Sequence, residues 1–204
     1  EKAYIKPYAA CRYTHPSIDI AKDLRKNNMV DVELIDRVKI KTYSLAVKKH
    51  DHTDIKGSAS AKMSIPYNFA VTYVLGKTGM EAFTSDALEN PKVQSLTKKI
   101  VVTEDTEMTA AFPEKTIATV EVVLKDGSIL KGESILPKGE PENPLSLEET
   151  IEKFSALAVY GGKTDEEIQK INNYEKNTFY TYVSIIAFDR LRQRGYAYSR
   201  TTRD

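Results

Sequence analysis

The sequence predicts an α+β protein: a small, mostly antiparallel sheet with helices packed on one face, followed by C-terminal helices. Two kinds of pattern support this fold class. Residues 116–124 and 128–136 alternate apolar and polar positions around Asp126-Gly127, which is typical of a β-hairpin. Residues 16–28 and 64–75 instead carry apolar side chains at helical spacing, which favours helices that cover a sheet.

The first helix is expected to begin at Pro16, because proline suits the first helical turn, and to end near Asn27-Asn28. From about residue 32 to 47 the pattern changes to period two. Lysine and arginine side chains alternate there with apolar ones, so we expect a half-buried strand whose outer face is basic and solvated.

Ser64 is the natural N-cap of the second helix, and Gly76 is its expected stop. Residues 80–98 predict one or two short helices that Pro91 interrupts, with Asn90 as a cap. A short apolar strand at 100–103 and the hairpin follow.

Two capping boxes, Ser146-x-x-Glu149 and Thr164-x-x-Glu167, predict the helices near the C-terminus. Gly161-Gly162 lies between them and is the best internal boundary. We therefore expect an α+β domain over residues 1–160 and a helical extension over residues 161–204.

Composition restricts the partners and the compartment. The net charge is +1, so no general field favours nucleic acid or an anionic membrane, and no apolar run reaches the roughly 18 residues that a membrane helix needs. Cys11 is the single cysteine, and no signal peptide is recognisable, so a reducing cytoplasm is expected. His50-x-His52 has the spacing of a metal site, but two neighbouring histidines are too few for zinc, and we predict no metal.

The stretch from Lys6 to Ala21 carries the strongest chemical signal. Lys6, Arg12 and His15 lie between an extended Lys-Pro start and a helix N-terminus, whose dipole and free N–H groups attract anions. Arg12 can hold a carboxylate with two parallel hydrogen bonds, Lys6 can act as a point charge, and His15 can move a proton near neutral pH. Three cationic groups also occur together by chance, so an ordinary helix entry is the alternative.

Three stretches, in order, resemble the MmgE/PrpD family: Lys6 to Ala21, Ala61 to Tyr67 and Lys138 to Ser146. The resemblance covers about residues 5–158. It implies activity on small polycarboxylates without a metal or organic cofactor, since family members include 2-methylcitrate dehydratases, cis-aconitate decarboxylases and iminodisuccinate epimerases. It also implies a large all-helical domain ahead of this region, absent from this chain. We therefore expect a C-terminal region that is inactive alone.

The resemblance assigns roles to particular residues. Lys6, His15 and Tyr13 are the expected catalytic residues, with His15 moving protons and Tyr13 a weaker donor. Cys11 departs from part of the family, because some decarboxylases carry histidine there as we align the motif. This departure disfavours decarboxylase chemistry and leaves dehydratase or epimerase chemistry. The expected reaction is dehydration of a substrate such as 2-methylcitrate, and epimerase or decarboxylase chemistry is the alternative. The expected substrate-binding residues are Arg12, Lys62, Ser64, Tyr67 and Lys138.

A function of a different class is a non-catalytic module for interaction or dimerisation. Residues 178–194 predict a helix with a broad apolar surface, which could pack on the helical domain or on a second copy. A homodimer is the expected assembly of this chain.

Overall fold

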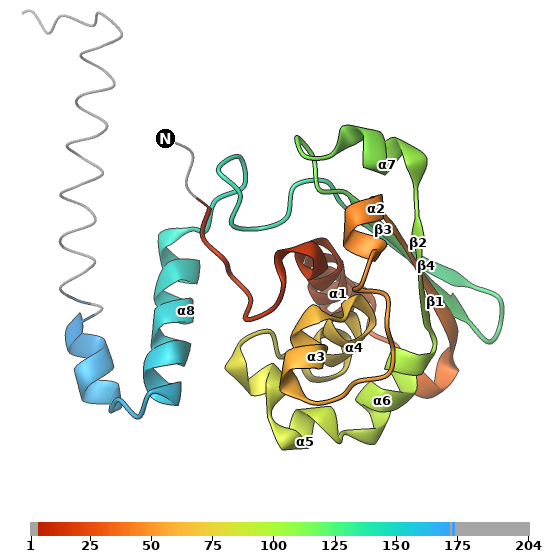
Figure 1. Cartoon of the computed structure of the whole chain (residues 1–204). Helices are drawn as coiled ribbons and strands as arrows, with labels where there is room; N and C mark the ends of the chain where they lie inside the picture. The colour runs from red at the N-terminus through yellow and green to blue at the C-terminus, as the bar shows by residue number, and fades with distance from the viewer. Residues whose placement is uncertain (1–3, 172, 174–204) are drawn as a thin grey trace, which may run out of the picture. The chain divides into compact units, whose positions relative to one another are not determined.

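The computed structural model describes residues 4–171 and 173 of the chain, which divides into two compact units between Lys153 and Phe154 (Figure 1). The first unit contains the sheet, the opening segment and all three stretches on which the family resemblance rests. The boundary that the sequence suggested at Gly161-Gly162 stays a prediction.

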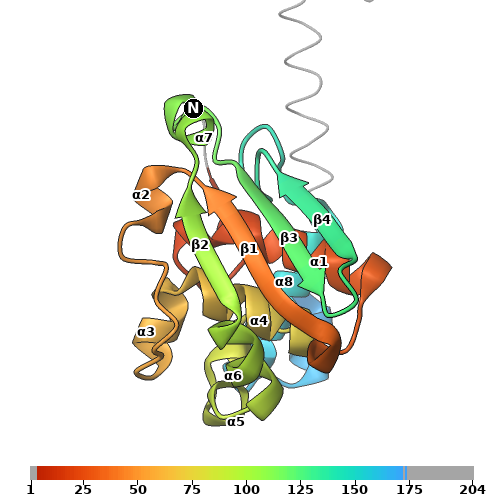
Figure 2. The ribbon, with the colours of Figure 1, turned by 90° about the vertical axis from the view of Figure 1, so that its right-hand side faces the viewer.

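In the described part of the chain, four strands form one sheet in the order β2-β1-β3-β4. The pair β1–β2 is parallel, and the pairs β1–β3 and β3–β4 are antiparallel, so the predicted mostly antiparallel sheet is confirmed. Figure 2 shows the strands side by side with α1 and α4 behind them, on one face. The strands are β1 (Ile35–Thr42), β2 (Ile100–Glu104), β3 (Ala118–Leu124) and β4 (Ile129–Ser134).

Strand β1 is shorter than its period-two pattern suggested. A 3₁₀ turn, η2 (Val32–Leu34), precedes it, and a short helix, α2 (Ser44–Val47), follows it. The strand is half-buried as expected. Val38 and Ile40 face the core. The basic side chains that alternate with them are exposed on the outer face of the sheet, and these are Arg37, Lys39 and Lys41.

The hairpin between β3 and β4 follows from its turn residues. Gly127 has φ +87°, a conformation that glycine adopts without steric cost. The Asp126 carboxylate accepts a hydrogen bond from the Ser128 amide at 2.9 Å, which fixes the turn locally. The predicted hairpin is therefore confirmed.

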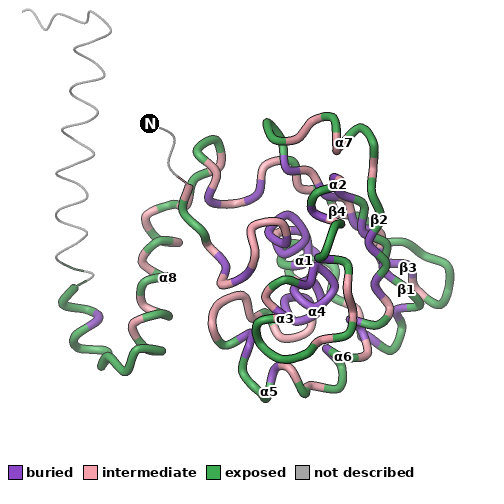
Figure 3. Tube along the Cα trace, in the orientation of Figure 1, coloured by how far each residue is buried: buried purple, intermediate pink, exposed green. Residues whose placement is uncertain are grey.

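Helices α1 (His15–Asn28) and α4 (Ile65–Leu75) pack against each other and form the core with the sheet (Figures 1 and 3). Residues 65–73 of α4 are all buried, so this helix is enclosed on every side. Ser64 caps it by accepting a hydrogen bond from the Tyr67 amide at 3.1 Å, and Gly76 ends it at φ 69°. Both predicted helix ends are confirmed.

Short elements complete the first unit. Asn90 caps one of them, as predicted, by accepting hydrogen bonds from the amides of Lys92 and Val93. They are η1 (Arg12–Thr14), α3 (Ser58–Met63), η3 (Met80–Phe83), α5 (Ser85–Leu88), α6 (Pro91–Lys98) and α7 (Thr106–Ala111).

Helix α8 (Leu147–Tyr160) begins with the predicted capping box, because Ser146 and Glu149 exchange backbone-to-side-chain hydrogen bonds at 2.7 and 3.2 Å. The second box, Thr164 with Glu167, also forms. The helix predicted over 178–194 lies outside the described residues. No helix in the described part of the chain is long and apolar enough to span a membrane.

Candidate anion-binding site

Arg12 is the centre of the candidate site. It begins the 3₁₀ turn η1 that leads into α1, and its guanidinium group lies 4.7 Å above the centre of the Tyr4 ring. Its Nη2 donates to the Thr116 hydroxyl at 3.3 Å and to the Glu140 carboxylate. Three segments that are distant in sequence therefore fix the plane of this guanidinium.

The other amino group of Arg12 is left without a partner. In the part of the chain that the structure describes, just two buried side-chain atoms lack a hydrogen bond, and these are Arg12 Nη1 and the Tyr43 hydroxyl. An unsatisfied buried donor costs about 1–3 kcal/mol. The held guanidinium thus presents one free edge that can donate to an oxygen.

His15 is buried beneath the opening segment. Its Nε2 lies 3.3 Å from the Ala10 carbonyl oxygen, which can only accept, so Nε2 carries the hydrogen. Nδ1 is then the acceptor for the Tyr4 hydroxyl at 2.8 Å. Burial, together with the positive charge of Arg12, lowers the pKa of His15 to about 3. The ring is therefore neutral at neutral pH, with both nitrogens in use.

Lys6 and Tyr13 are less constrained. Lys6 is exposed and forms no hydrogen bond or ion pair with another described residue, although its charge acts on His15. The Tyr13 ring packs edge-on against Tyr43 and His50 at 6.1 and 5.2 Å between centres, and its hydroxyl bonds to no other described residue. Burial lowers the pKa of His15, and the charges of Arg12 and Lys6 lower it further.

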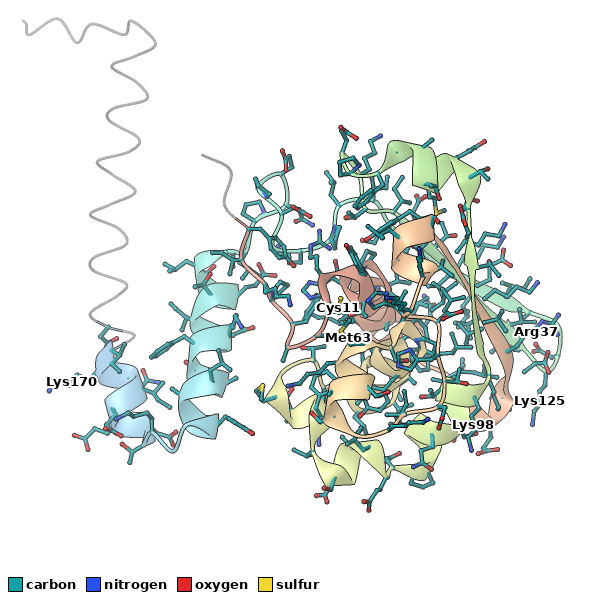
Figure 4. The ribbon with its side chains drawn as sticks, viewed as in Figure 1. Cys11, Arg37, Met63, Lys98, Lys125 and Lys170 are labelled. Carbon is teal, nitrogen blue, oxygen red and sulfur yellow. The ribbon has the colours of Figure 1, made fainter. Side chains whose placement is uncertain are left out.

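The second stretch lies beside the first but is bonded internally. The Cys11 amide donates to the Lys62 carbonyl at 2.8 Å, which places Cys11 next to Met63 and α3 (Figure 4). The Lys62 ammonium lies 5.4 Å above the Phe83 ring. Substrate contact by Lys62 stays a prediction.

Ser64 and Tyr67 are buried, and both hydroxyl groups are used within the protein. Ser64 Oγ donates to the His52 carbonyl at 2.6 Å, and the Tyr67 hydroxyl donates to the Ala82 carbonyl at 2.6 Å. Burial raises the pKa of Tyr67 to about 12, so it stays protonated. These bonds give both residues a structural role, and their contact with substrate stays a prediction.

Lys138 contacts residues of α1 and α8. Its amide donates to the Asp19 carboxylate at 2.8 Å, and its ammonium pairs with Glu149 at 3.0 Å. Asp19 also accepts from the Tyr8 hydroxyl, and the Tyr8 ring packs on His15. Tyr4 and Ala10, and not Asp19, therefore hold the His15 ring.

The histidine pair at 50 and 52 is also hydrogen-bonded within the protein. His50 donates from Nδ1 to the Lys48 carbonyl at 2.9 Å, and its Nε2 lies 3.5 Å from Cys11 Sγ. His52 Nε2 lies 3.2 Å from the Ser60 carbonyl. Within the described ranges, no group of three or more His, Cys, Asp or Glu residues is placed to hold a metal ion.

Four residues of the site were not found from the sequence: Tyr4, Tyr43, Thr116 and Glu140. Glu140 lies inside the third stretch of the family resemblance, so that stretch was the available signal. Tyr4 precedes the first stretch by two positions. Tyr43 follows β1, and Thr116 lies just before β3, the strand that pairs with β1. No local sequence pattern marks either residue.

These elements define an α+β domain with a fixed arginine at the turn before its first long helix. The family model for the MmgE/PrpD C-terminal domain matches residues 8–176, which is most of the chain. The chain therefore belongs to the MmgE/PrpD family through its C-terminal domain, and this family includes lyases. A search of curated proteins finds no significant match.

Proposed function

We propose that this chain is the C-terminal domain of a lyase that dehydrates a small polycarboxylate such as 2-methylcitrate. One observation carries the proposal beyond the family: Arg12 is fixed by Tyr4, Thr116 and Glu140, yet one of its buried amino groups has no partner among the described residues. A pre-positioned guanidinium with a free edge is suited to a carboxylate, since it loses little freedom on binding.

Dehydration removes a proton next to a carboxylate and expels the β-hydroxyl group as water. The developing negative charge on that carboxylate is stabilised by cations held at the right place. In this proposal Arg12 binds the carboxylate, and the Lys6 ammonium, which pairs with no other described residue, supplies a second charge. The Tyr13 hydroxyl, which has no partner among the described residues, donates the proton to the leaving hydroxyl.

His15 enters the proposal through its neutral state. It accepts from the hydroxyl of Tyr4, whose ring lies beneath the Arg12 guanidinium, so Tyr4 connects the arginine with the buried histidine. Burial raises the pKa of Tyr4 to about 12, so its hydroxyl stays protonated. A bound carboxylate offsets the charges of Arg12 and Lys6, both of which lower the pKa of His15. Substrate binding therefore raises the pKa of His15, and its Nδ1 accepts, through the Tyr4 hydroxyl, the proton that is removed from the substrate carbon. The proton that His15 gains and the proton that Tyr13 gives up are exchanged with solvent after the water has left.

Turnover tests the proposal, with the chain joined to the helical domain of its family. We expect Arg12→Gln to lower kcat/KM for 2-methylcitrate at least about 100-fold, because the carboxylate loses its charged partner. The matched control is Arg37→Gln, which removes an exposed arginine paired with Asp36 on the outer face of the sheet. Unchanged turnover in the Arg12 variant would contradict the proposal.

The same assay separates the reactions. Product formation from cis-aconitate with release of carbon dioxide would indicate the decarboxylase alternative, and inversion of iminodisuccinate would indicate the epimerase alternative. Arg12 binds a carboxylate in each case, so its variant is expected to fail with whichever substrate the protein uses. The proposed helical domain and the homodimer both stay predictions.

A further inference from the structure

Tyr43 is a fully buried tyrosine whose hydroxyl has no partner among the described residues. It follows β1 directly, and its ring stacks on Phe112 with 4.6 Å between centres. The ring is therefore held firmly, while the polar end is unsatisfied. A buried hydroxyl in that state requires an acceptor or a donor that the described part of the chain does not supply.

Two sets of contacts connect the region of Tyr43 with Arg12. Thr42 Oγ1 donates to the Ile117 carbonyl at 2.8 Å, and the preceding Thr116 accepts from Arg12. Tyr13, the neighbour of Arg12, packs edge-on against the Tyr43 ring. Burial raises the pKa of the Tyr43 hydroxyl, and the positive charge of Arg12 opposes that rise.

The two unsatisfied buried atoms of the described chain thus lie in one region, and they need the same kind of partner. Arg12 Nη1 can only donate, and the Tyr43 hydroxyl can donate as well. An oxygen that accepts from both would satisfy both. A carboxylate oxygen fits best, since it accepts several hydrogen bonds and offsets the guanidinium charge.

We propose that Tyr43 is a substrate-binding residue whose hydroxyl, together with Arg12 Nη1, binds one carboxylate oxygen of the polycarboxylate. This inference rests on the proposed function and adds a residue to its site. The phenol supplies a neutral donor from the residue that follows β1. Tyr43 thereby contributes to the affinity for the carboxylate and also helps to fix its orientation.

Tyr43→Phe tests the inference, because it removes the hydroxyl and keeps the ring stacked on Phe112. The probe is citrate, and its affinity for the whole chain is measured by calorimetry, with thermal unfolding measured in parallel without citrate. We expect citrate to bind the variant about tenfold more weakly. Without citrate we expect the variant to be at least as stable as the wild type, because an unsatisfied polar group has been removed.

Tyr73→Phe is the matched control. Tyr73 is also fully buried, but its hydroxyl accepts a hydrogen bond from the Val30 amide at 2.9 Å. Its variant should be less stable and should bind citrate like the wild type. The two tyrosine variants thus separate a structural hydroxyl from a ligand-binding one by opposite outcomes.

Three results would overturn the inference. The first is equal citrate affinity in wild type and Tyr43→Phe. The second is a marked loss of stability of Tyr43→Phe without citrate, which would mean that a bound water satisfies the hydroxyl. The third is no citrate binding by the wild-type chain, which would show that Arg12 and Tyr43 do not form a carboxylate site on their own. None of these results decides the proposed function, which depends on turnover of Arg12 variants.

Discussion

The Tyr4 hydroxyl donates to His15 Nδ1 over 2.8 Å, and this bond joins the first described residue of the chain to a fully buried imidazole. The opposite nitrogen donates to the Ala10 carbonyl. Both nitrogens have partners suited to the neutral ring. If His15 were protonated, Nδ1 could no longer accept from Tyr4, and the positive charge would be buried. The histidine that the sequence suggested as a proton carrier is thus first a fixed neutral group.

This state predicts an acid-sensitive fold. The pKa of His15 is about 3 in the folded protein and about 6.5 in the unfolded chain, so the unfolded chain binds the proton first as the pH falls. Stability should therefore decrease below about pH 6.5, by about 1.4 kcal/mol for each pH unit from this one group. Denaturant unfolding between pH 7 and pH 4.5 measures this slope.

His15→Gln serves as the reference, because glutamine does not titrate. Its stability should depend less on pH over the same window, whatever its absolute value. His50, whose pKa burial also lowers, remains in both proteins and cancels from the comparison. Equal slopes in the two proteins would show that His15 is not buried as a neutral ring.

Glu140 is expected to weaken anion binding even as it holds Arg12. Its carboxylate bonds to Nη2 and partly neutralises the guanidinium. Glu140→Gln keeps an oxygen acceptor and removes the charge, so citrate should bind about three- to tenfold more tightly at low salt. Calorimetry checks this, with Glu121→Gln as the control, because Glu121 pairs with Lys131 on the outer face of the sheet. Weaker binding by the Glu140 variant would mean that positioning of Arg12 matters more than its charge.

We expect Lys6 to contribute to turnover and not to the stability of the fold. It is exposed and bonds to no other described residue, so Lys6→Ala should leave the unfolding free energy nearly unchanged. In the protein with its helical domain, we expect turnover to fall at least about 100-fold, equivalent to about 2.7 kcal/mol. Lys56→Ala, another exposed lysine, is the control. Full activity of the Lys6 variant would remove Lys6 from the mechanism.

Gly139 is expected to tolerate no side chain. Its φ is +96°, and a Cβ atom there would lie 2.0 Å from the Ile5 carbonyl oxygen, which is part of the backbone. We expect Gly139→Ala to lower the unfolding free energy by about 3 kcal/mol or more. Gly127→Ala has a similar φ and open space around it, so about 1–2 kcal/mol is expected there. Chemical denaturation of both variants measures the difference, and similar losses would contradict the close packing of Gly139.

The parts of the fold that depend on residues close together in the sequence were predictable. The Ser64 cap, the Asp126-Gly127 turn and the two capping boxes each form between residues at most four apart, so their spacing is visible in the sequence. The parallel pairing of β1 with β2 was not predicted, because residues 43–99 separate them and no local signal sets the direction of a pairing.

The candidate site divides in the same way. Arg12 was recognisable by its place before a helix, since anions favour helix N-termini and arginine favours carboxylates. Its partners were not, because Thr116 and Glu140 meet it only in the folded chain. The neutral state of His15 also depends on burial, which the sequence alone does not give.

The hydrogen bonds that hold Arg12 have a consequence for the order of folding. Its two polar partners lie 104 and 128 positions further along the chain, whereas the motif itself is complete at Ala21. Closing loops of that length is slow and depends on the sheet having formed. During synthesis the entire opening motif therefore leaves the ribosome well before its guanidinium can be fixed. A chain stopped ahead of Glu140 would carry every residue of the motif and still lack a formed site.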